Sequence, residues 1–298
     1  MDIIAEIEEL KKKRRAIILA HNYQRPEVQD IADFVGDSLE LAREAVDVDA
    51  SVIVFCGVMF MAEMATILNP DKVVLIPDNS AGCPLADTIT PSDVRKLRKE
   101  HEGVPVVAYV NTTASVKAEA DICCTSANSV EVVQSLESDE VIFVPDRNLG
   151  IYTQKNSDKH LIIWEGACGV HVGISKEDLL IMKRMHPNAK IVVHPECNPE
   201  VMDMADAIAS TGGMVKYVRE CDAQEFIIGT EMGHVYRLSR LFPDKKFYGL
   251  YNAVCNDMKK ITLEKVRDSL KNMQYRVTVP DDIARKARRA IERMLALR

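Results

Sequence analysis

The segment VVHPEC, residues 192–197, places a histidine, a glutamate and a cysteine directly after two β-branched valines. His194 and Cys197 are residue types that bind metals, and a carboxylate beside a histidine is typical of proton transfer. The same pattern fits an ordinary strand end, where polar residues follow a buried strand. This segment alone does not decide between a metal site, an acid/base pair and a structural strand end.

Three segments share this organisation, which indicates an internal repeat. In each, a polar or aromatic residue follows a short apolar run, and a second such residue stands two positions later. The pairs are His21 and Tyr23, Tyr109 and Asn111, and His194 and Glu196. Counted from the first member of each pair, an aspartate stands at position 12 (Asp33, Asp121, Asp206) and a hydroxyl residue at position 17 (Ser38, Ser126, Thr211). The aspartates precede short strands, where we expect structural roles at turns and helix ends.

A cysteine late in each repeat forms a further column. Cys83, Cys168 and Cys255 lie 62, 59 and 61 positions after the first residue of their pair. Three thiolates suit three corners of a [4Fe–4S] cluster, whose fourth iron then lacks a protein ligand and can act as a Lewis acid. Zinc on three cysteines is one alternative, and three unrelated loop cysteines are another. Cys56, Cys123 and Cys221 have no such partners and are expected to pack as small hydrophobes.

Short strands alternating with helices must position these residues. Nine β-branched runs lack strict alternation, which is typical of parallel strands buried on both faces. They span 16–23, 51–58, 72–78, 104–111, 141–146, 160–166, 190–196, 225–230 and 245–251. Helical patterns between them predict an α/β fold with right-handed crossovers. We expect three homologous three-layer αβα domains with short parallel sheets around a pseudo-threefold axis.

The repeat also predicts the domain boundaries. We expect αβα domains at 16–103, 104–188 and 189–275. Apolar residues at helical spacing predict an amphipathic helix over 1–15 and another over 281–298, both packed on the body. In the second helix, the residues expected to face the body are Ile283, Ala287, Ala290, Ile291 and Met294.

If the three strand ends face one axis, their polar residues line one cavity and the three cysteines meet there, because ligands bind at the carboxyl ends of parallel strands. We expect Glu196 to be the general acid/base, with a pKa raised toward neutrality by partial burial. His21 and His194 are expected to donate to substrate or to shuttle protons. Tyr23 and Tyr109 are candidate weak acids or donors, although aromatic packing explains Tyr23 equally well. Cys197 is expected to pack near the site rather than to bind the metal.

Short polar residues near helix starts are candidates for binding anionic groups of a substrate, although plain helix capping explains any one of them. The segment STGGMVK, 210–216, is the best phosphate candidate, because Gly212 and Gly213 let backbone amides approach closely. The expected substrate-binding set is His21, Ser38, Tyr109, Val110, Asn111, Ser126, His194, Pro195, Glu196, Ser210 and Thr211.

Composition restricts the class of protein. The 298 residues are 47% hydrophobic and 28% charged with a net charge of −7, so we expect a globular protein that binds neither nucleic acid nor anionic membranes. The first 17 residues carry charges throughout and lack a signal-peptide core. No run approaches the roughly 20 apolar residues that span a membrane, so we expect a cytoplasmic protein.

Several motifs in order resemble the quinolinate synthase family, the second enzyme of bacterial and archaeal NAD biosynthesis. They are AHNYQ (20–24), DSLELA (37–42), TSAN (125–128), PDRNLG (145–150) and HPEC (194–197). The resemblance runs from about residue 16 to 298. It implies a transferase that condenses iminoaspartate with dihydroxyacetone phosphate to quinolinate, releasing phosphate and two waters.

The resemblance also implies a [4Fe–4S] cluster on Cys83, Cys168 and Cys255, with the open iron binding substrate. A functional link to an enzyme that produces iminoaspartate follows from the same reaction. Two departures stand out. No cysteine follows Cys255, so the cysteine-rich C-terminal motif of some members, and a thiol switch there, is not expected. EGACGVHV, 165–172, also differs around Cys168, but Cys168 and His171 still match.

Two other classes of function remain open from the residues alone. One is a different cluster-dependent hydro-lyase acting on a small hydroxy acid. The other is an electron carrier or metal-binding scaffold that uses the three cysteines. Electron carriers normally ligate every iron through protein and do not need histidine, tyrosine and glutamate around the cluster, which favours an enzyme.

Overall fold

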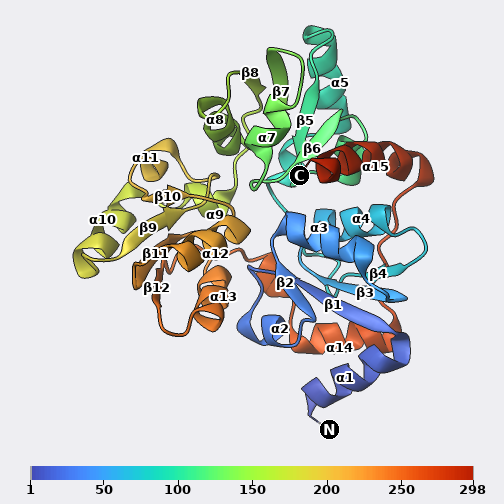
Figure 1. Cartoon of the computed structure of the whole chain (residues 1–298). Helices are drawn as coiled ribbons and strands as arrows, with labels where there is room; N and C mark the ends of the chain where they lie inside the picture. The colour runs from blue at the N-terminus through green and yellow to red at the C-terminus, as the bar shows by residue number, and fades with distance from the viewer. Residues whose placement is uncertain (1, 298) are drawn as a thin grey trace.

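Three four-stranded parallel sheets organise the chain in the computed structural model, which describes residues 2–297 (Figure 1). We use the terms first, second and third unit for the three successive parts of the chain, each of which contains one sheet and the helices that connect its strands. The first sheet contains β1 (Ala16–His21), β2 (Phe34–Gly36), β3 (Val52–Cys56) and β4 (Val73–Leu75). The second contains β5 (Val106–Tyr109), β6 (Ile122–Cys124), β7 (Glu140–Val144) and β8 (His160–Ile163). The third contains β9 (Lys190–Val193), β10 (Ala207–Ile208), β11 (Glu225–Gly229) and β12 (Lys246–Gly249).

The strand order is the same in every sheet: second, first, third, fourth. All pairings are parallel, for example His21 with Gly36 in the first sheet and Tyr109 with Cys124 in the second. The α/β class with three short parallel sheets is therefore confirmed, and the common topology is what three copies of one unit produce. The domain boundaries expected from the repeat stay a prediction.

Helices connect the strands and cover the sheets. The first unit has α2 (Pro26–Asp30), α3 (Ser38–Asp47), α4 (Met59–Leu68), the 3₁₀ turn η1 (Ala86–Thr88) and α5 (Pro91–Glu100). The second has α6 (Ala114–Lys117), α7 (Ser129–Gln134), α8 (Arg147–Lys155), α9 (Gly169–Val172) and α10 (Lys176–Met185). The third has α11 (Pro199–Met202), α12 (Thr211–Glu220), α13 (Gly233–Leu241), η2 (Met258–Lys260) and α14 (Leu263–Asn272).

The nine expected strands all form, and each ends earlier than the apolar pattern indicates. β1 ends at His21 rather than at Tyr23, and β9 ends at Val193, so His194 and Glu196 lie in the following loop. The polar residues that follow these strands lie beyond the sheet, where the chain passes from the buried core to a cavity. Three further short strands, β2, β6 and β10, follow the repeated aspartates.

The repeated aspartates have the same structural role in all three units. In each, the side chain accepts a backbone N–H of the central strand, and the aspartate N–H donates to the carbonyl of that same residue. The pairs are Asp33 with Ile18, Asp121 with Val106 and Asp206 with Ile191, with side-chain distances of 2.7, 2.7 and 2.8 Å. These bonds fix the chain as it enters the short edge strand, which gives the expected structural role a specific form.

Two helices at the ends of the chain pack on the body. α1 (Ile3–Arg14) lies against α14, and α15 (Asp281–Ala296) lies against α4, α6 and β6, so it bridges the first and second units (Figure 1). In α15 the buried residues are Ala287, Ala290, Ile291 and Met294, and Ile283 is partly buried against the same core. Each of these helices lies within its expected range; Met1 and Arg298, which the expected ranges include, lie outside the described residues.

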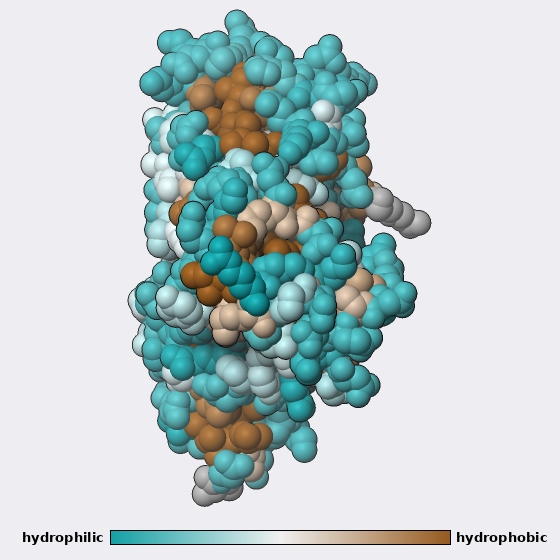
Figure 2. Space-filling view, turned by 90° about the vertical axis from the view of Figure 1, so that its left-hand side faces the viewer, coloured by the Kyte–Doolittle hydropathy of each residue, from teal (hydrophilic) through white to brown (hydrophobic). Residues whose placement is uncertain are grey.

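The surface is mainly hydrophilic with separate apolar patches, as Figure 2 shows for the side that carries α10. On α10, Ile181 and Met185 are 54% and 64% exposed. Within residues 2–297, every helix is too short or too polar to cross a membrane.

Candidate active site

A cavity of about 340 Å³ lies at the carboxyl ends of the central strands of all three sheets. Its volume is at the lower end of the range for small-molecule sites. The expected site residues that line it are His21, Tyr23, Ser38, Cys83, Tyr109, Asn111, Ser126, Cys168, His194, Glu196, Thr211 and Cys255. The structure therefore gathers all three strand-end pairs, the three hydroxyl residues and the three cysteines around one space.

Three other expected binding residues lie behind the cavity wall. Val110 is fully buried, and its N–H donates to Cys124 O. Pro195 is buried between His194 and Glu196. The Ser210 hydroxyl caps α12 by accepting the N–H of Gly213, and it lies 3.3 Å from Asp37 Oδ2. Each of the three packs beside a lining residue.

His21 and His194 occupy equivalent places and make equivalent bonds. His21 Nδ1 accepts the N–H of Tyr23 at 3.2 Å, and His194 Nδ1 accepts the N–H of Glu196 at 3.3 Å. Burial lowers the pKa of each ring to about 3, so both are neutral near pH 7. A neutral imidazole that accepts at Nδ1 carries its proton on Nε2. Both residues are therefore set up as Nε2–H donors to a bound molecule.

Glu196 is 2% exposed and is held by groups from two units. His171 Nδ1 lies 2.6 Å from Glu196 Oε2, and Asn111 Nδ2 donates to Oε1 at 3.5 Å. Burial acts to raise the pKa of Glu196, but electrostatic interactions with His171 and His194 and hydrogen bonds from His171 and Tyr109 outweigh it and lower the pKa to about 2. The expected rise toward neutrality is wrong, because burial brings stabilising partners with it.

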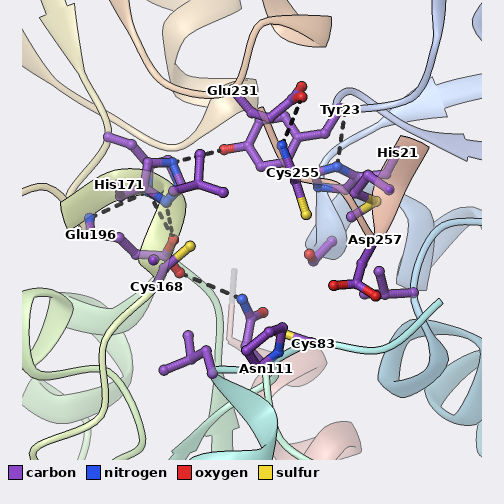
Figure 3. A pocket seen from close by; sticks show the side chains of 18 of the residues that line it. His21, Tyr23, Cys83, Asn111, Cys168, His171, Glu196, Glu231, Cys255 and Asp257 are labelled. Atoms are coloured by element: carbon purple, nitrogen blue, oxygen red, sulfur yellow. Dashed lines mark hydrogen bonds and ion pairs between the residues drawn. The ribbon is translucent and has the colours of Figure 1, made fainter. Parts of the chain in front are cut away.

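A chain of hydrogen-bonding groups continues from His171 to Tyr23. His171 Nε2 lies 2.9 Å from Thr230 Oγ1, and the Tyr23 hydroxyl lies 2.6 Å from that same oxygen. Burial and the negative charge of Glu196 raise the pKa of Tyr23 well above its ordinary value, so Tyr23 stays a neutral phenol. Glu196, His171, Thr230 and Tyr23 thus form a continuous path of polar groups, of which Glu196, His171 and Tyr23 line the cavity (Figure 3).

The three predicted ligand cysteines come from three different loops and face the same space (Figure 3). All eight cysteines of the chain are free thiols. Burial raises the pKa of Cys83 to about 12 and also raises the pKa of Cys168 and Cys255. Thiols this difficult to ionise become ligands only when a metal compensates the charge. A group of soft thiols from three directions fits an iron–sulfur cluster better than a hard cation.

Cys168, His171 and Glu196 also lie close enough to hold a single ion, with ligand atoms within 4.8 Å of one another. His171 Nδ1 and Glu196 Oε2 contact each other directly, however, and the other nitrogen of His171 faces Thr230. These atoms already serve as partners for one another, which favours the three-cysteine set as the metal centre. Cys197 is fully buried with its Sγ 3.5 Å from Gly229 O, as expected for a packing residue.

Two of the three repeated hydroxyl residues, Ser38 and Thr211, lie at helix starts, whereas Ser126 lies in the turn before α7. Ser38 is the first residue of α3 and Thr211 the first of α12, and both line the cavity. Asn22 Nδ2 donates to Thr211 Oγ1 at 2.9 Å, which ties the first unit to the third. Gly212 has a packing role, because a Cβ there would come within 2.7 Å of Asp37 Oδ2. The absence of a side chain at Gly212 therefore allows the third unit to pack against Asp37 of the first unit, in addition to any close approach of an anion to the backbone.

Several residues that line the cavity are absent from the expected site. His171 stands three positions after Cys168 but has no counterpart in the other repeats, so the repeat pattern does not reveal it. Glu231 lines the cavity, and Thr230 precedes it in the chain. Both follow the apolar strand β11, so the expectation that ligands bind at the carboxyl ends of parallel strands would have indicated them. Asp257 lies two positions beyond Cys255, in its loop.

Comparison with known proteins places this arrangement in a family. The model of the quinolinate synthetase A protein family matches residues 5–296. A quinolinate synthase of Methanoregula boonei is 57% identical over 293 residues, covering 98% of this chain and 97% of the relative. Quinolinate synthases of Dehalococcoides mccartyi and Pyrococcus furiosus are each 56% identical, over 97% and 98% of this chain and 96% and 97% of the relatives. The chain is therefore an enzyme that belongs to the quinolinate synthetase A family.

Proposed function

We propose that this enzyme condenses iminoaspartate with dihydroxyacetone phosphate to form quinolinate, phosphate and two waters in NAD biosynthesis. The observation that carries the proposal is the convergence of three cysteines and three strand-end pairs on one cavity. Cys83, Cys168 and Cys255 would hold a [4Fe–4S] cluster. When bound, the cluster supplies an open iron that acts as a Lewis acid toward a substrate hydroxyl or carboxylate.

The substrates carry two carboxylates and a phosphate, and the cavity offers donors for them. His21 and His194 are neutral imidazoles whose Nε2–H groups can donate hydrogen bonds to the substrate. Because the rings carry no charge, they need no charged partner in the free enzyme. Ser38 and Thr211 add hydroxyls at the N-termini of ten-residue helices, where the helix dipole favours negative charge. Ser126 adds a third hydroxyl from the second unit. The three units thus each contribute a donor to an anionic ligand.

Loss of two waters and aromatisation require protons to leave carbon and to reach oxygen. Glu196 is ionised near pH 7 and is therefore set to accept a proton, and His171, 2.6 Å away, stabilises the carboxylate between turnovers. Tyr109 and Asn111 hold the carboxylate in position through hydrogen bonds. Tyr23 is a neutral phenol that can return a proton to a leaving oxygen, and Thr230 connects it with His171. The assignment of Glu196 as base thus keeps the expected role with an unexpected pKa.

Two further elements belong to the proposal. An enzyme that produces iminoaspartate must supply this site, because an imine of this kind hydrolyses in water. A cytoplasmic location suits the eight free cysteines, since thiols persist in a reducing compartment.

Anaerobic purification followed by an assay tests the proposal. We expect a brown protein with about three to four irons per chain. This protein should form quinolinate from enzymatically generated iminoaspartate and dihydroxyacetone phosphate. A colourless protein that binds zinc contradicts the cluster. A brown protein that forms no quinolinate but dehydrates another small hydroxy acid contradicts the substrates while keeping the cluster.

A further inference from the structure

The loops that carry the three cysteines are built on one plan. In each unit, a backbone N–H just after the third strand of the unit donates to the carbonyl two positions before the cysteine. The donor and acceptor pairs are Met59 with Ala81, Arg147 with Gly166 and Met232 with Ala253, at 2.8, 2.7 and 2.9 Å. The cysteine loops are therefore anchored to the same place in each sheet, and positions around them can be compared across units.

The position before each donor differs in a way that bears on the cysteines. It is Asp146 in the second unit, Glu231 in the third and Val58 in the first. Asp146 Oδ2 accepts the backbone N–H of Cys168 at 3.2 Å. Glu231 Oε1 accepts the backbone N–H of Cys255 at 3.2 Å, as Figure 3 shows. Both carboxyl groups are fully buried. The backbone N–H of two of the proposed ligand cysteines is thus held by a carboxyl group at the equivalent position of its unit.

The loop of Cys83 receives its carboxyl group from another unit. Val58 has no polar side-chain atom, but Asp257 Oδ1 accepts the N–H of Gly82, which precedes Cys83, at 3.1 Å. Lys260 Nζ donates to Asp257 Oδ1 at 2.7 Å and to Ser80 O at 2.6 Å, so it fixes both loops. The first and third cysteine loops are therefore joined to each other.

Both buried carboxyl groups are anchored on their far side as well. Asp146 Oδ1 accepts the N–H of Leu149 and caps α8, and Glu231 Oε2 accepts the N–H of Gly233 at the start of α13. Lys259 Nζ lies 2.9 Å from Glu231 Oε1. Each carboxyl group thus connects a helix start with a cysteine, and its oxygens accept these bonds whether or not it is protonated.

We propose that Asp146, Glu231 and Asp257 are positioning residues that hold the three cysteine loops in the geometry of the cluster. This inference rests on the proposed function only in taking Cys83, Cys168 and Cys255 as the ligands. A backbone N–H that is bound to a carboxyl group at or next to a cysteine fixes the main chain from which the cysteine side chain projects. Partners of this kind, beyond the ligands themselves, typically change metal affinity by 10–100-fold.

Iron release from the reconstituted full-length enzyme tests the proposal. Asp146→Ala, Glu231→Ala and Asp257→Ala remove the bonds, while Asp146→Asn, Glu231→Gln and Asp257→Asn keep an acceptor oxygen. Asp146→Ser keeps a cap for α8 but lacks the second oxygen for Cys168. Asp206→Ala is the control, since Asp206 makes a similar bond to a strand N–H away from the cysteines. The rate at which an iron chelator bleaches the anaerobic cluster is measured, with thermal unfolding of the cluster-free proteins alongside.

We expect the alanine variants and Asp146→Ser to lose iron about tenfold faster or more than the unchanged enzyme. Asp257→Asn keeps an oxygen for the single bond to Gly82 and should retain most of the protection. Asp146→Asn and Glu231→Gln keep only one of two acceptor oxygens, so their iron release should fall between that of the unchanged enzyme and that of the alanine variants. Asp206→Ala should lose iron at the normal rate although it unfolds more readily. If an alanine variant does not fold, Asp146→Ser decides for the second unit.

Normal iron release from folded alanine variants overturns the proposal, and so does equally fast release from Asp206→Ala. If the unchanged enzyme assembles no cluster, the proposed function fails instead, which is a distinct result.

Discussion

His171 Nδ1 lies 2.6 Å from Glu196 Oε2, so the helix that follows one cysteine of the second unit meets the strand end of the third. The two side chains are buried, and the ring of His171 also stacks on that of His194 at 4.5 Å. This contact holds Glu196 ionised in a place where burial alone would protonate it. Proton transfer at this site therefore depends on a contact between units.

Glu196→Gln is expected to abolish quinolinate formation, with a loss of about 10²–10⁴-fold. Glutamine keeps the shape and the hydrogen bonds of the side chain but cannot accept a proton. The visible absorbance and iron content of the anaerobic enzyme should stay unchanged, because Glu196 is not among the three cysteine ligands. Retained turnover would refute the assignment of Glu196 as base.

Thr230→Val is expected to lower turnover by about tenfold or more, since it removes the oxygen shared by His171 and Tyr23 while keeping the volume. Buried partners left without a bond also cost stability, by about 1–3 kcal/mol. Thr153→Val is the matched control: Thr153 is fully buried and bonds Ser129 at 2.7 Å, outside the cavity wall. Equal activity losses in both variants would show that the effect is structural.

Replacing Cys83, Cys168 or Cys255 singly with serine is expected to remove the cluster, so that iron falls from about four per chain to near zero. Cys197→Ser should keep its iron, because the Cys197 thiol is buried against Gly229 O. Iron and sulfide analysis after anaerobic reconstitution makes the comparison. Full iron in any of the first three variants would exclude that cysteine as a ligand.

His234→Leu is expected to reduce the acid sensitivity of folding. His234 is fully buried, and burial lowers its pKa to about 3. As the pH falls below about 6.5, the His234 side chain binds a proton in the unfolded chain but stays neutral in the folded protein. The free energy of unfolding therefore decreases by up to about 1.4 kcal/mol per pH unit for this group. The contribution is complete above the unfolded pKa and is lost between about 6.5 and 3.

Urea unfolding of the cluster-free protein at pH 7, 6 and 5 measures this effect. The difference in unfolding free energy between His234→Leu and the unchanged chain should shift in favour of the variant as the pH falls. His160→Gln, at an exposed position, serves as the control and should show no such trend. Parallel curves for all three proteins would contradict the prediction.

Asp206→Ala is expected to lower the free energy of unfolding by about 1–3 kcal/mol, because it leaves the buried N–H of Ile191 without its side-chain acceptor. Turnover per folded molecule should be normal, since Asp206 lies outside the cavity wall. Denaturant unfolding and an assay at a temperature well below the transition check both parts. A large loss of turnover in the folded variant would mean that the repeated aspartates act beyond the scaffold.

The repeated α/β unit was predictable from the sequence, because β-branched runs, regular spacing and the aspartate column are local properties of the chain. The cysteine column and the polar strand ends were predictable as well, since each unit carries them at nearly the same position. The apolar pattern predicts strands that are too long, because it does not show where the hydrogen bonds to neighbouring strands end.

The contacts between residues of different units were not predictable from the sequence and required the folded chain. His171 has no repeated counterpart, and its contact with Glu196 arises where two units pack together. The same packing changes the direction in which the pKa of Glu196 shifts. Burial alone would raise this pKa, whereas interactions with His171, His194 and Tyr109 lower it to about 2. The carboxyl groups of Asp146, Glu231 and Asp257 likewise gain their role from the loops that they face. Interactions between units depend on distances that no local pattern encodes, so they required the folded structure.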